Sequence, residues 1–365
     1  MAGVYLSWPF CGQKCTYCNF ASGVLPREWE PRYEAALLHE LRGFPWSWTP
    51  RTVYLGGGSP SRMNEATLAA LLGAIPGAPW SEATLEAAPG EITPTRAAAW
   101  RSLGITRASL GTQSFVEAEL RRTGRRHTPA LAAHDVETLR TAGIANINLD
   151  LICGLPGQTR ASWESSLDWI ERLQVPHVSV YMLEVDEDSR LGLEILNNGS
   201  RYGADGVPSD DVQVELYERA VERLRVHGLE RYEISNFARP GFESRHNLKY
   251  WRLEPYAGFG ADAHSCSEGL RWQNAESVAE YVGAMDSGLS PRRDEHPADP
   301  ASERFFVGLR LNAGVDVSEE DERHYGERFR VLQRDGLLER SGARVRLTPR
   351  GVLLSNEVFQ EFLPS

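Results

Sequence analysis

The sequence predicts an α/β fold in which a parallel sheet curls into a barrel or partial barrel, followed by a smaller, mainly helical region. Over roughly the first 200 residues, short apolar runs alternate six times with helical patterns, and beyond about residue 190 this rhythm changes. Such alternation indicates parallel strands joined by right-handed crossovers, which favour a curled sheet. The pattern alone is also compatible with a doubly wound open sheet.

The six expected strands cover residues 4–7, 51–55, 83–88, 105–110, 146–152 and 177–183. Between them, helices are expected at about 27–42, at 64–75, from 93 to 100, from 128 to 143 and after 159. Asn64, Thr93, Thr128 and Thr159 are suitable N-caps for four of these helices. Functional loops should follow the carboxyl ends of the strands.

The remaining chain predicts a long helix from Ser209 to Gly228 and then an aromatic-rich stretch over residues 232–266. Residues 286–301 are rich in Pro, Asp, Glu and Arg and are expected to form a linker. The segments that follow are typical of a winged helix: helices at about 302–311 and 318–334, a hairpin at 336–347 and a final helix. The predicted domains are 1–200 (barrel), 201–290 (barrel extension) and 291–365 (C-terminal domain).

Composition narrows the class of protein. The 365 residues include 41% hydrophobic and 24% charged residues, as in globular proteins with a core. The net charge of −11 argues against broad binding of nucleic acid, although residues 121–126 are locally basic. The sequence indicates no signal peptide and no membrane span, and its five cysteines do not form a disulfide framework. A cytoplasmic location is therefore expected.

Three cysteines are crowded into one loop after the first expected strand. Cys11, Cys15 and Cys18 have the spacing C-x3-C-x2-C. A [4Fe–4S] cube normally takes four thiolates, so three would leave one iron open to a substrate. A zinc site is one alternative, but it needs a fourth ligand, and the first histidine, His39, falls on an expected helix. The other alternative is that the cysteines are buried as small apolar residues, although chance burial rarely places three of them on one loop between a strand and a helix. The loop therefore predicts a [4Fe–4S] cluster.

A glycine run follows the second expected strand, where the sequence reads Gly56-Gly57-Gly58-Ser59-Pro60. It lacks the GK[ST] ending of a phosphate-binding P-loop. Taken alone it predicts a tight turn. Glycine also permits a ligand to approach the backbone closely.

Together, the cysteine spacing and the glycine run resemble the signature of the radical SAM superfamily, in which the glycine motif usually reads GGGTP. That resemblance implies a partial (β/α)6 barrel that binds a [4Fe–4S] cluster and S-adenosylmethionine (SAM). It also implies reductive cleavage of SAM as the chemistry of the superfamily.

Further motifs resemble the coproporphyrinogen III oxidase-like branch of that superfamily. They are Tyr5 to Phe10, Leu85 to Pro89, Ser109 to Phe115, Gly124 to His127 and Asp150 to Thr159. In this branch the matching residues surround SAM, which implies a binding set of Tyr5, Gly57, Gly58, Ser59, Glu86, Gln113, Arg125 and Asp150. Carboxylates suit ribose hydroxyls, and an arginine suits the carboxylate of methionine.

Two features separate the chain from the oxidases themselves. The oxidases have a fourth cysteine two positions after the third, where this chain has Phe20, and an extension before the cluster loop, where this chain has ten residues. The sequence from His246 to Trp251 resembles the HNxxYW motif of HemW-type heme chaperones. This resemblance implies that His246 contacts heme, since imidazole is a common axial ligand. A histidine among aromatic residues can also be a core residue.

The expected function is that of a HemW-type heme chaperone that binds a [4Fe–4S] cluster, SAM and heme. Its expected partners are a heme-acceptor protein, which could be membrane-associated, and a reductase or flavodoxin-like electron donor, with no nucleic acid. The alternative is an oxygen-independent coproporphyrinogen III oxidase. A third reading, a winged-helix regulator with an iron–sulfur sensor, conflicts with the acidic charge and the SAM motifs.

Overall fold

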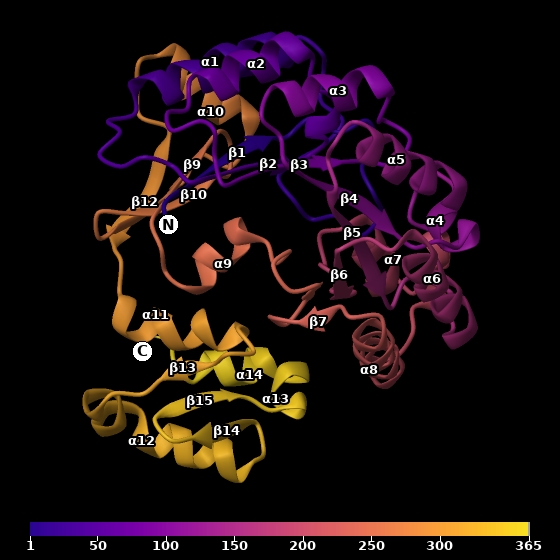
Figure 1. Cartoon of the computed structure of the whole chain (residues 1–365), viewed down its shortest axis with the longest axis vertical. Coiled ribbons are helices and arrows are strands. Elements are labelled where there is room, and N and C mark those ends of the chain that lie inside the picture. Colours follow the sequence, from indigo (N-terminus) through magenta and orange to yellow (C-terminus); the bar gives the residue numbers. More distant parts are fainter. Residues whose placement is uncertain (364–365) are drawn as a thin grey trace.

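The computed structural model describes residues 1–363. Six parallel strands form the centre of a 12-stranded sheet and confirm the predicted α/β partial barrel. These strands are β1 (Gly3–Trp8), β2 (Thr52–Gly57), β3 (Glu82–Ala87), β4 (Arg107–Gln113), β5 (Asn146–Cys153) and β6 (His177–Met182). Figure 1 shows the sheet curving as an open arc, with helices along its outer side.

The helices on the outer side connect successive parallel strands. They are α1 (Trp29–Gly43), α2 (Glu65–Gly73), α3 (Pro94–Ser102), α4 (Glu117–Arg122), α5 (Pro129–Thr141) and α6 (Arg160–Leu173). The four expected N-caps of α2, α3, α5 and α6 all accept a hydrogen bond from a backbone N–H of the first turn, which satisfies a group that the helix leaves free. The short helix α4 was not expected from the sequence.

The alternation of side chains along each strand separates an apolar outer layer from a polar interior. In β1, Val4 and Leu6 are buried in the main hydrophobic core. Tyr5 lies between them and therefore points to the opposite face, where its ring stacks on that of Tyr54 from β2. The interior of the arc is thus lined by polar and aromatic side chains from successive strands.

Strands from the second half of the chain extend both edges of the sheet. β9 (Tyr256–Phe259) pairs in parallel with β1 and is followed by β10 (His264–Ser267), β11 (Leu270–Asn274) and β12 (Arg292–Pro297) in antiparallel order. At the other edge β8 (Asn236–Ala238) and β7 (Glu230–Arg231) run antiparallel. The prediction of a linker at residues 286–301 is wrong, because this segment contains β12. Most side chains of β12 are exposed, so the sequence shows no apolar alternation that would indicate a strand.

The second half of the chain also supplies further helices around the sheet. They are α7 (Arg190–Leu196), a 3₁₀ segment at Arg201–Gly206, α8 (Asp210–Val226), α9 (Arg245–Trp251) and α10 (Val278–Asp286). Figure 1 shows α9 on the concave side of the sheet, between the barrel strands and the C-terminal region.

The C-terminal region has helices around a small sheet ordered β13-β15-β14. Its elements are α11 (Pro300–Phe306), a 3₁₀ turn at Gly308–Arg310, β13 (Val315–Asp316), α12 (Glu319–Arg334), β14 (Leu338–Ser341), β15 (Arg344–Leu347), α13 (Pro349–Leu353) and α14 (Ser355–Gln360). The helix expected at 302–311 is thus divided in two. Phe305, Phe329 and Phe362 pack their rings together at the centre of this region.

Candidate cofactor site

The three predicted cluster ligands lie on one loop directly after β1. Backbone hydrogen bonds join the two sides of its base, from Cys11 N to Gly23 O (2.8 Å) and from Gly23 N to Pro9 O (2.9 Å). In its middle, Thr16 N donates to Thr123 O, which ties the loop to the end of α4. The loop is therefore anchored to β1 and α4, while all three cysteine side chains stay partly accessible to solvent.

The thiols are close enough to influence one another. Burial raises the pKa of Cys11, a hydrogen bond with Ser22 partly offsets this change, and the charges of Cys18 and Cys15 add to it, so the Cys11 thiol favours its protonated form until a positive centre binds there. Within residues 1–363, no three His, Cys, Asp or Glu side chains are arranged around a single metal ion. In a cubane, by contrast, each cysteine binds a different iron. Three thiolates on one loop are thus a donor set that fits a cubane.

The glycine run lies beside the base of this loop, at the end of β2. Gly58 N donates to Trp8 O (2.8 Å) and Ser59 N donates to Phe10 O (2.9 Å). A Cβ atom at Gly58 would lie 2.7 Å from Trp8 O, which is too close for any side chain. Gly57 has φ of 103°, a left-handed value that favours glycine. The packing of β1 against β2 therefore requires these glycines even before a ligand is considered.

Glu86, from β3, occupies the polar interior next to the glycine run. Its carboxylate accepts hydrogen bonds from the Tyr54 hydroxyl (2.8 Å) and from Gly57 N (3.2 Å). Burial raises the pKa of Glu86 to about 7, a change that the hydrogen bond from Tyr54 partly offsets. Glu86 can thus exchange a proton near neutral pH, and its carboxylate lies beside a backbone edge that a ligand could approach.

Asp150, from β5, faces the same interior. It accepts hydrogen bonds from Asn148 Nδ2 (2.7 Å) and Ser109 Oγ (3.3 Å), and burial raises its pKa above the ordinary value. The charge of Asp150 also helps to raise the pKa of Glu86, which indicates that the two carboxyl groups share one low-dielectric space.

Arg125 and Gln113 complete the cysteine-loop end of the interior. The guanidinium of Arg125 donates to Gly111 O (2.6 Å) and to the hydroxyl of Tyr17 within the cysteine loop. Although burial lowers the pKa of Arg125, Tyr17 and Cys15 raise it overall, so its positive charge is secure beside the thiols. Gln113 has a left-handed φ of 66°, and its buried Oε1 has no hydrogen-bond partner within residues 1–363.

The structure thus brings the cluster residues and most of the predicted SAM residues to one end of the barrel. Tyr5 lies in the middle of β1, where its ring stacks on Tyr54. A fixed cation, two carboxyl groups, a free amide oxygen and a glycine edge match the carboxylate, amino and ribose hydroxyl groups of SAM. Tyr54 and Tyr17 were not identified from the sequence, although alternation along the second strand from Val53 would have placed Tyr54 in the interior.

His246 lies elsewhere, on α9 at the opposite end of the barrel strands. Its side chain is 1% exposed. Its Nδ1 lies 2.9 Å from Thr52 Oγ1, and its Nε2 lies 2.8 Å from the Tyr250 hydroxyl. Burial and then the nearby Lys249 lower the pKa of His246 well below its usual value. The imidazole is neutral, as iron ligation requires, but both ring nitrogens have partners, so ligation would require one bond to break.

Two residues that the sequence did not single out hold α9 in place. The carboxylate of Glu82 accepts hydrogen bonds from the backbone N–H groups of Arg245 (3.1 Å) and His246 (2.9 Å), at the positive end of the helix. Lys249 is fully buried, with its Nζ 3.4 Å from the centre of the Tyr250 ring. Spacing alone offered no signal for either contact.

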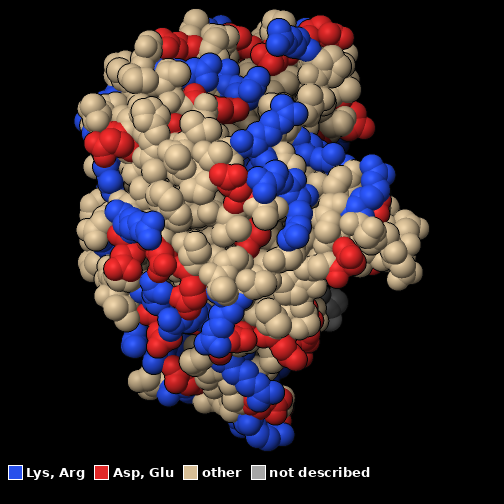
Figure 2. All heavy atoms as spheres, turned by 90° about the vertical axis from the view of Figure 1, so that its right-hand side faces the viewer, with Lys and Arg blue, Asp and Glu red and all other residues tan. Residues whose placement is uncertain are grey.

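The surface beside the cysteine loop is locally basic. Figure 2 shows Lys and Arg side chains in a band on the face that lies to the right in Figure 1, where α4 is found. Arg121 and Arg122 of α4 are exposed, and Arg190 of α7 donates to the carbonyl of Lys14 in the cysteine loop. The basic segment predicted at 121–126 therefore adjoins the cluster loop, although the whole chain has a net charge of −11. No helix within residues 1–363 is both long and apolar enough to cross a membrane.

Comparisons with known proteins agree with this geometry. Residues 5–170 match the Radical SAM superfamily, and residues 296–354 match the HemN C-terminal domain. The coproporphyrinogen III oxidase HemN from Escherichia coli has the same fold, with a TM-score of 0.84 over 99% of this chain and 89% of that chain, at 20% identity. The barrel with its cysteine loop is therefore that of a radical SAM protein.

Curated relatives narrow the family further. The chain is 35% identical to the heme chaperone HemW of Lactococcus lactis, over 98% of this chain and 96% of the relative. It is 33% identical to that of Bacillus subtilis, over 100% and 99%, and 34% identical to that of Escherichia coli, over 84% and 82%. The chain belongs to the HemW heme chaperone family.

Proposed function

We propose that this protein is a heme carrier that holds a [4Fe–4S] cluster on Cys11, Cys15 and Cys18, binds SAM beside it and delivers heme to an acceptor protein. The observation that carries the proposal is the convergence of the cysteine loop, Arg125 and Glu86 at one end of a barrel in a chain of the HemW family. When bound, the cluster supplies single-electron reduction to SAM at its open iron.

The residues of the chain would bind and orient SAM in the proposed complex. Arg125, fixed by Gly111 O and Tyr17, would pair with the carboxylate of the methionine moiety. The edge of Gly57, Gly58 and Ser59 would face its amino group. The remaining polar groups would line the nucleoside, and they are Tyr5, Glu86, Gln113 and Asp150. Once ionised, the Glu86 carboxylate would accept a hydrogen bond from a ribose hydroxyl, and its raised pKa of about 7 places this ionisation near neutral pH.

The basic surface around the cysteine loop suits an electron donor with acidic surface charge. Thr16 of the cysteine loop contacts Thr123, which directly follows Arg121 and Arg122 in the sequence, so these two arginines lie close to the loop. Complementary charge accelerates encounter and is weakened by salt. Reduction of the cluster by a flavodoxin-like protein is therefore expected to slow as ionic strength rises.

Two parallel assays on the cluster-loaded protein test the carrier proposal. Heme transfer to an apo-hemoprotein is followed by the absorbance of the acceptor, and porphyrinogen oxidation is followed by porphyrin fluorescence. Transfer without oxidation supports the proposal. Robust porphyrinogen turnover would instead assign the chain to the oxidases, despite Phe20, whose side chain is 68% exposed at the position of their fourth cysteine.

A further inference from the structure

A chain of buried hydrogen bonds leads away from Asp150 through the interior of the barrel. Asn148 lies two residues before Asp150 on β5, and its Nδ2 donates to Asp150 Oδ1 (2.7 Å). His177 lies directly opposite Asn148 on the neighbouring strand β6, with its Nδ1 2.6 Å from Asn148 Oδ1. The side chains of Asn148 and His177 are 2% and 0% exposed, so bulk water does not compete for these hydrogen bonds.

The chain of hydrogen bonds continues beyond the sheet to the start of α9. His177 Nε2 lies 2.9 Å from the hydroxyl of Tyr232, which directly follows β7. The Tyr232 hydroxyl in turn accepts a hydrogen bond from the backbone N–H of Ser244 (3.2 Å), the N-cap of α9. The backbone carbonyl of Tyr232 also accepts from Asn312 N (3.0 Å), so the C-terminal region contacts the same residue. Side chains of β5, β6 and the segment after β7 therefore join Asp150 to the start of α9.

The chemistry of each member fixes the direction of these hydrogen bonds. The amide oxygen of Asn148 can only accept, so His177 Nδ1 carries the proton between them. Burial and then the charge of Arg107 lower the pKa of His177 well below its usual value, so the ring is neutral and its Nε2 accepts. Burial raises the pKa of Tyr232, an effect that Arg107 partly offsets, so the hydroxyl keeps the proton that it donates to Nε2. Every hydrogen bond in the chain thus donates toward Asp150.

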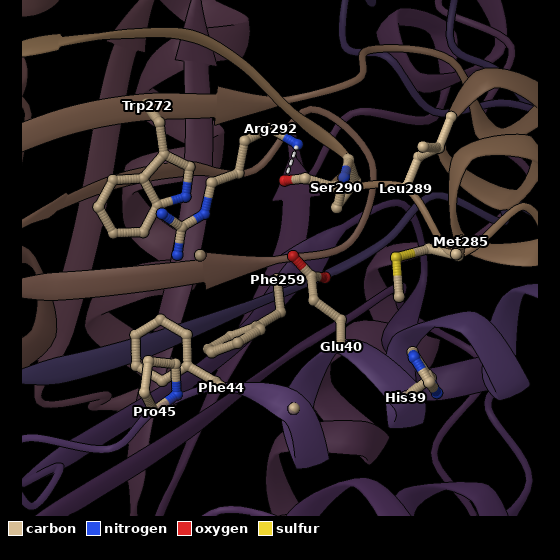
Figure 3. A pocket seen from close by; sticks show the side chains of 14 residues that line it. His39, Glu40, Phe44, Pro45, Phe259, Trp272, Met285, Leu289, Ser290 and Arg292 are labelled. Atoms are coloured by element: carbon tan, nitrogen blue, oxygen red, sulfur yellow. Dashed lines mark hydrogen bonds between the residues drawn. The ribbon is translucent and has the colours of Figure 1, made fainter.

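The carboxylate of Glu40 shows, for comparison, how hydrogen bonds that support the fold are arranged. Glu40 of α1 lines the cavity in Figure 3, between α1 and α10. It accepts from the Tyr281 hydroxyl (2.6 Å), Asn274 Nδ2 (2.7 Å) and Gly260 N (2.9 Å), which join α1 to α10 and to the strand extension. The donors to Asp150 lie instead on β4 and β5, which are already joined by their backbone hydrogen bonds. They orient the carboxylate of Asp150 rather than hold elements together.

We infer that Asn148, His177 and Tyr232 are positioning residues, which hold the Asp150 carboxylate in the orientation that SAM binding requires and link it to the start of α9. The inference rests on the proposed binding of SAM beside Asp150. A carboxylate that is already oriented loses less conformational freedom when a ribose hydroxyl binds to it, so its orientation strengthens binding. Two side chains separate Tyr232 from Asp150, so an effect of Tyr232 on SAM passes through His177 and Asn148.

The test is a titration of SAM into the full-length, cluster-loaded protein, followed by isothermal calorimetry. Tyr232→Phe removes one hydroxyl and leaves His177 Nε2 without its donor. This variant is expected to weaken SAM binding roughly three- to tenfold, the effect of one net hydrogen bond. Tyr281→Phe is the matched control, because it removes a hydroxyl that donates to the carboxylate of Glu40, and its affinity for SAM should equal that of the wild type.

A double-mutant cycle separates positioning from general destabilisation. In the Asp150→Asn background, Tyr232→Phe should cause no further loss of SAM affinity, because the carboxylate that the chain orients is gone. An equal loss in both backgrounds would overturn the inference, since Tyr232 would then act without Asp150. If the wild-type protein binds no SAM, both the proposed SAM site and this positioning role are wrong. If it binds SAM and Tyr232→Phe keeps the wild-type affinity, only the positioning role is wrong.

A second measurement does not depend on SAM. Nitrogen NMR of the protein labelled at histidine should show His177 with a protonated Nδ1 and an unprotonated Nε2, and Tyr232→Phe should shift the Nε2 resonance. His177→Gln assigns the signal by removing it. A proton on Nε2 instead would contradict the direction of the hydrogen bonds and overturn the inference.

Discussion

The two ends of the barrel differ in how far the polar groups of their predicted ligand residues, Gln113 at one end and His246 at the other, are satisfied. At the cysteine-loop end, the thiols are partly exposed and Gln113 Oε1 has no partner within residues 1–363. At the α9 end, His246 has two partners and the helix start is held by Glu82. Free polar groups favour the binding of a ligand, whereas satisfied and buried groups stabilise the fold. From this comparison we expect the first end to bind cofactors and the second end to contribute mainly to the stability of the fold.

The largest expected effect is the loss of the cluster when one cysteine at the cysteine-loop end is replaced. Cys15→Ala should abolish the cluster, because two thiolates cannot hold a cubane that already lacks a fourth. Iron and sulfide content after anaerobic reconstitution measures this loss. Cys266→Ala, which changes a cysteine on β10, is the control and should retain the cluster. Retention of full iron content by the Cys15 variant would contradict the assignment.

A large effect on stability is expected at the α9 end. His246→Ala should lower the free energy of unfolding by about 2–4 kcal/mol, because it leaves a cavity and removes the partners of Thr52 and Tyr250. Urea denaturation of the apo protein measures the change. The exposed His39→Ala should stay within about 0.5 kcal/mol of the wild type. Equal stability of both variants would show that His246 does not support the fold.

A moderate, pH-dependent effect is expected at the cysteine-loop end. With a pKa of about 7, Glu86 is mainly protonated at pH 6 and mainly ionised at pH 8. If the ionised carboxylate accepts from SAM, affinity for SAM should rise about tenfold over this range. Isothermal titration measures it, and Glu86→Gln should flatten the dependence, whereas Glu117→Gln on the surface should preserve it.

The raised pKa of Glu86 also affects the stability of the SAM-free protein, and here the expected pH dependence runs opposite to that of SAM affinity. The pKa of Glu86 is raised from 4.5 on folding, so the folded state retains a proton that the unfolded state loses. Stability of the SAM-free protein should therefore fall as pH rises from about 4.5 to about 7 and then level off. A flat profile in this window would contradict the raised pKa.

The smallest expected effect is a gain in stability at the α9 end. Lys249 Nζ is buried without a hydrogen-bond partner within residues 1–363, and burial lowers the pKa of Lys249 well below its usual value. Lys249→Met should raise the free energy of unfolding by about 1 kcal/mol, because it keeps the volume and removes an unsatisfied amine. Lys249→Ala, which leaves a cavity, should destabilise. A loss in the Met variant would show that contact with the Tyr250 and Tyr256 rings outweighs the burial cost.

The sequence predicts the parallel half of the fold well because its signals are local. The alternation of apolar runs with capped helices locates all six barrel strands, and the N-caps at Asn64 and Thr159 mark helix starts that the structure confirms. The sequence predicts a barrel extension over residues 201–290, but it does not predict the strands β9 to β12 that form the sheet edge. β12 has no buried face that an apolar pattern would reveal. β1 and β9 pair although they are far apart in the sequence, and no local pattern encodes such a contact.

For the site, residue types and spacing predicted the cysteines as cluster ligands, and the resemblance predicted Glu86, Arg125 and Asp150 as contacts of SAM. The structure brings these residues to one end of the barrel, and their roles stay predictions. The surroundings of His246 were not predictable, since a motif gives the identity of a side chain but not its orientation. Contacts with Thr52 and Glu82 depend on how α9 crosses the barrel, which only tertiary packing decides.

The pairing of β1 with β9 also bears on how the protein is made. β1 carries the cysteine loop at its carboxyl end, yet one of its two neighbours, Tyr256–Phe259, lies far along the chain. Translation proceeds from the N-terminus at about 5–20 residues per second, so this side of the strand stays open for many seconds during synthesis. During synthesis the cysteine loop therefore follows a strand that is paired on one side at most. β1 gains its second neighbour only after β9 has been translated.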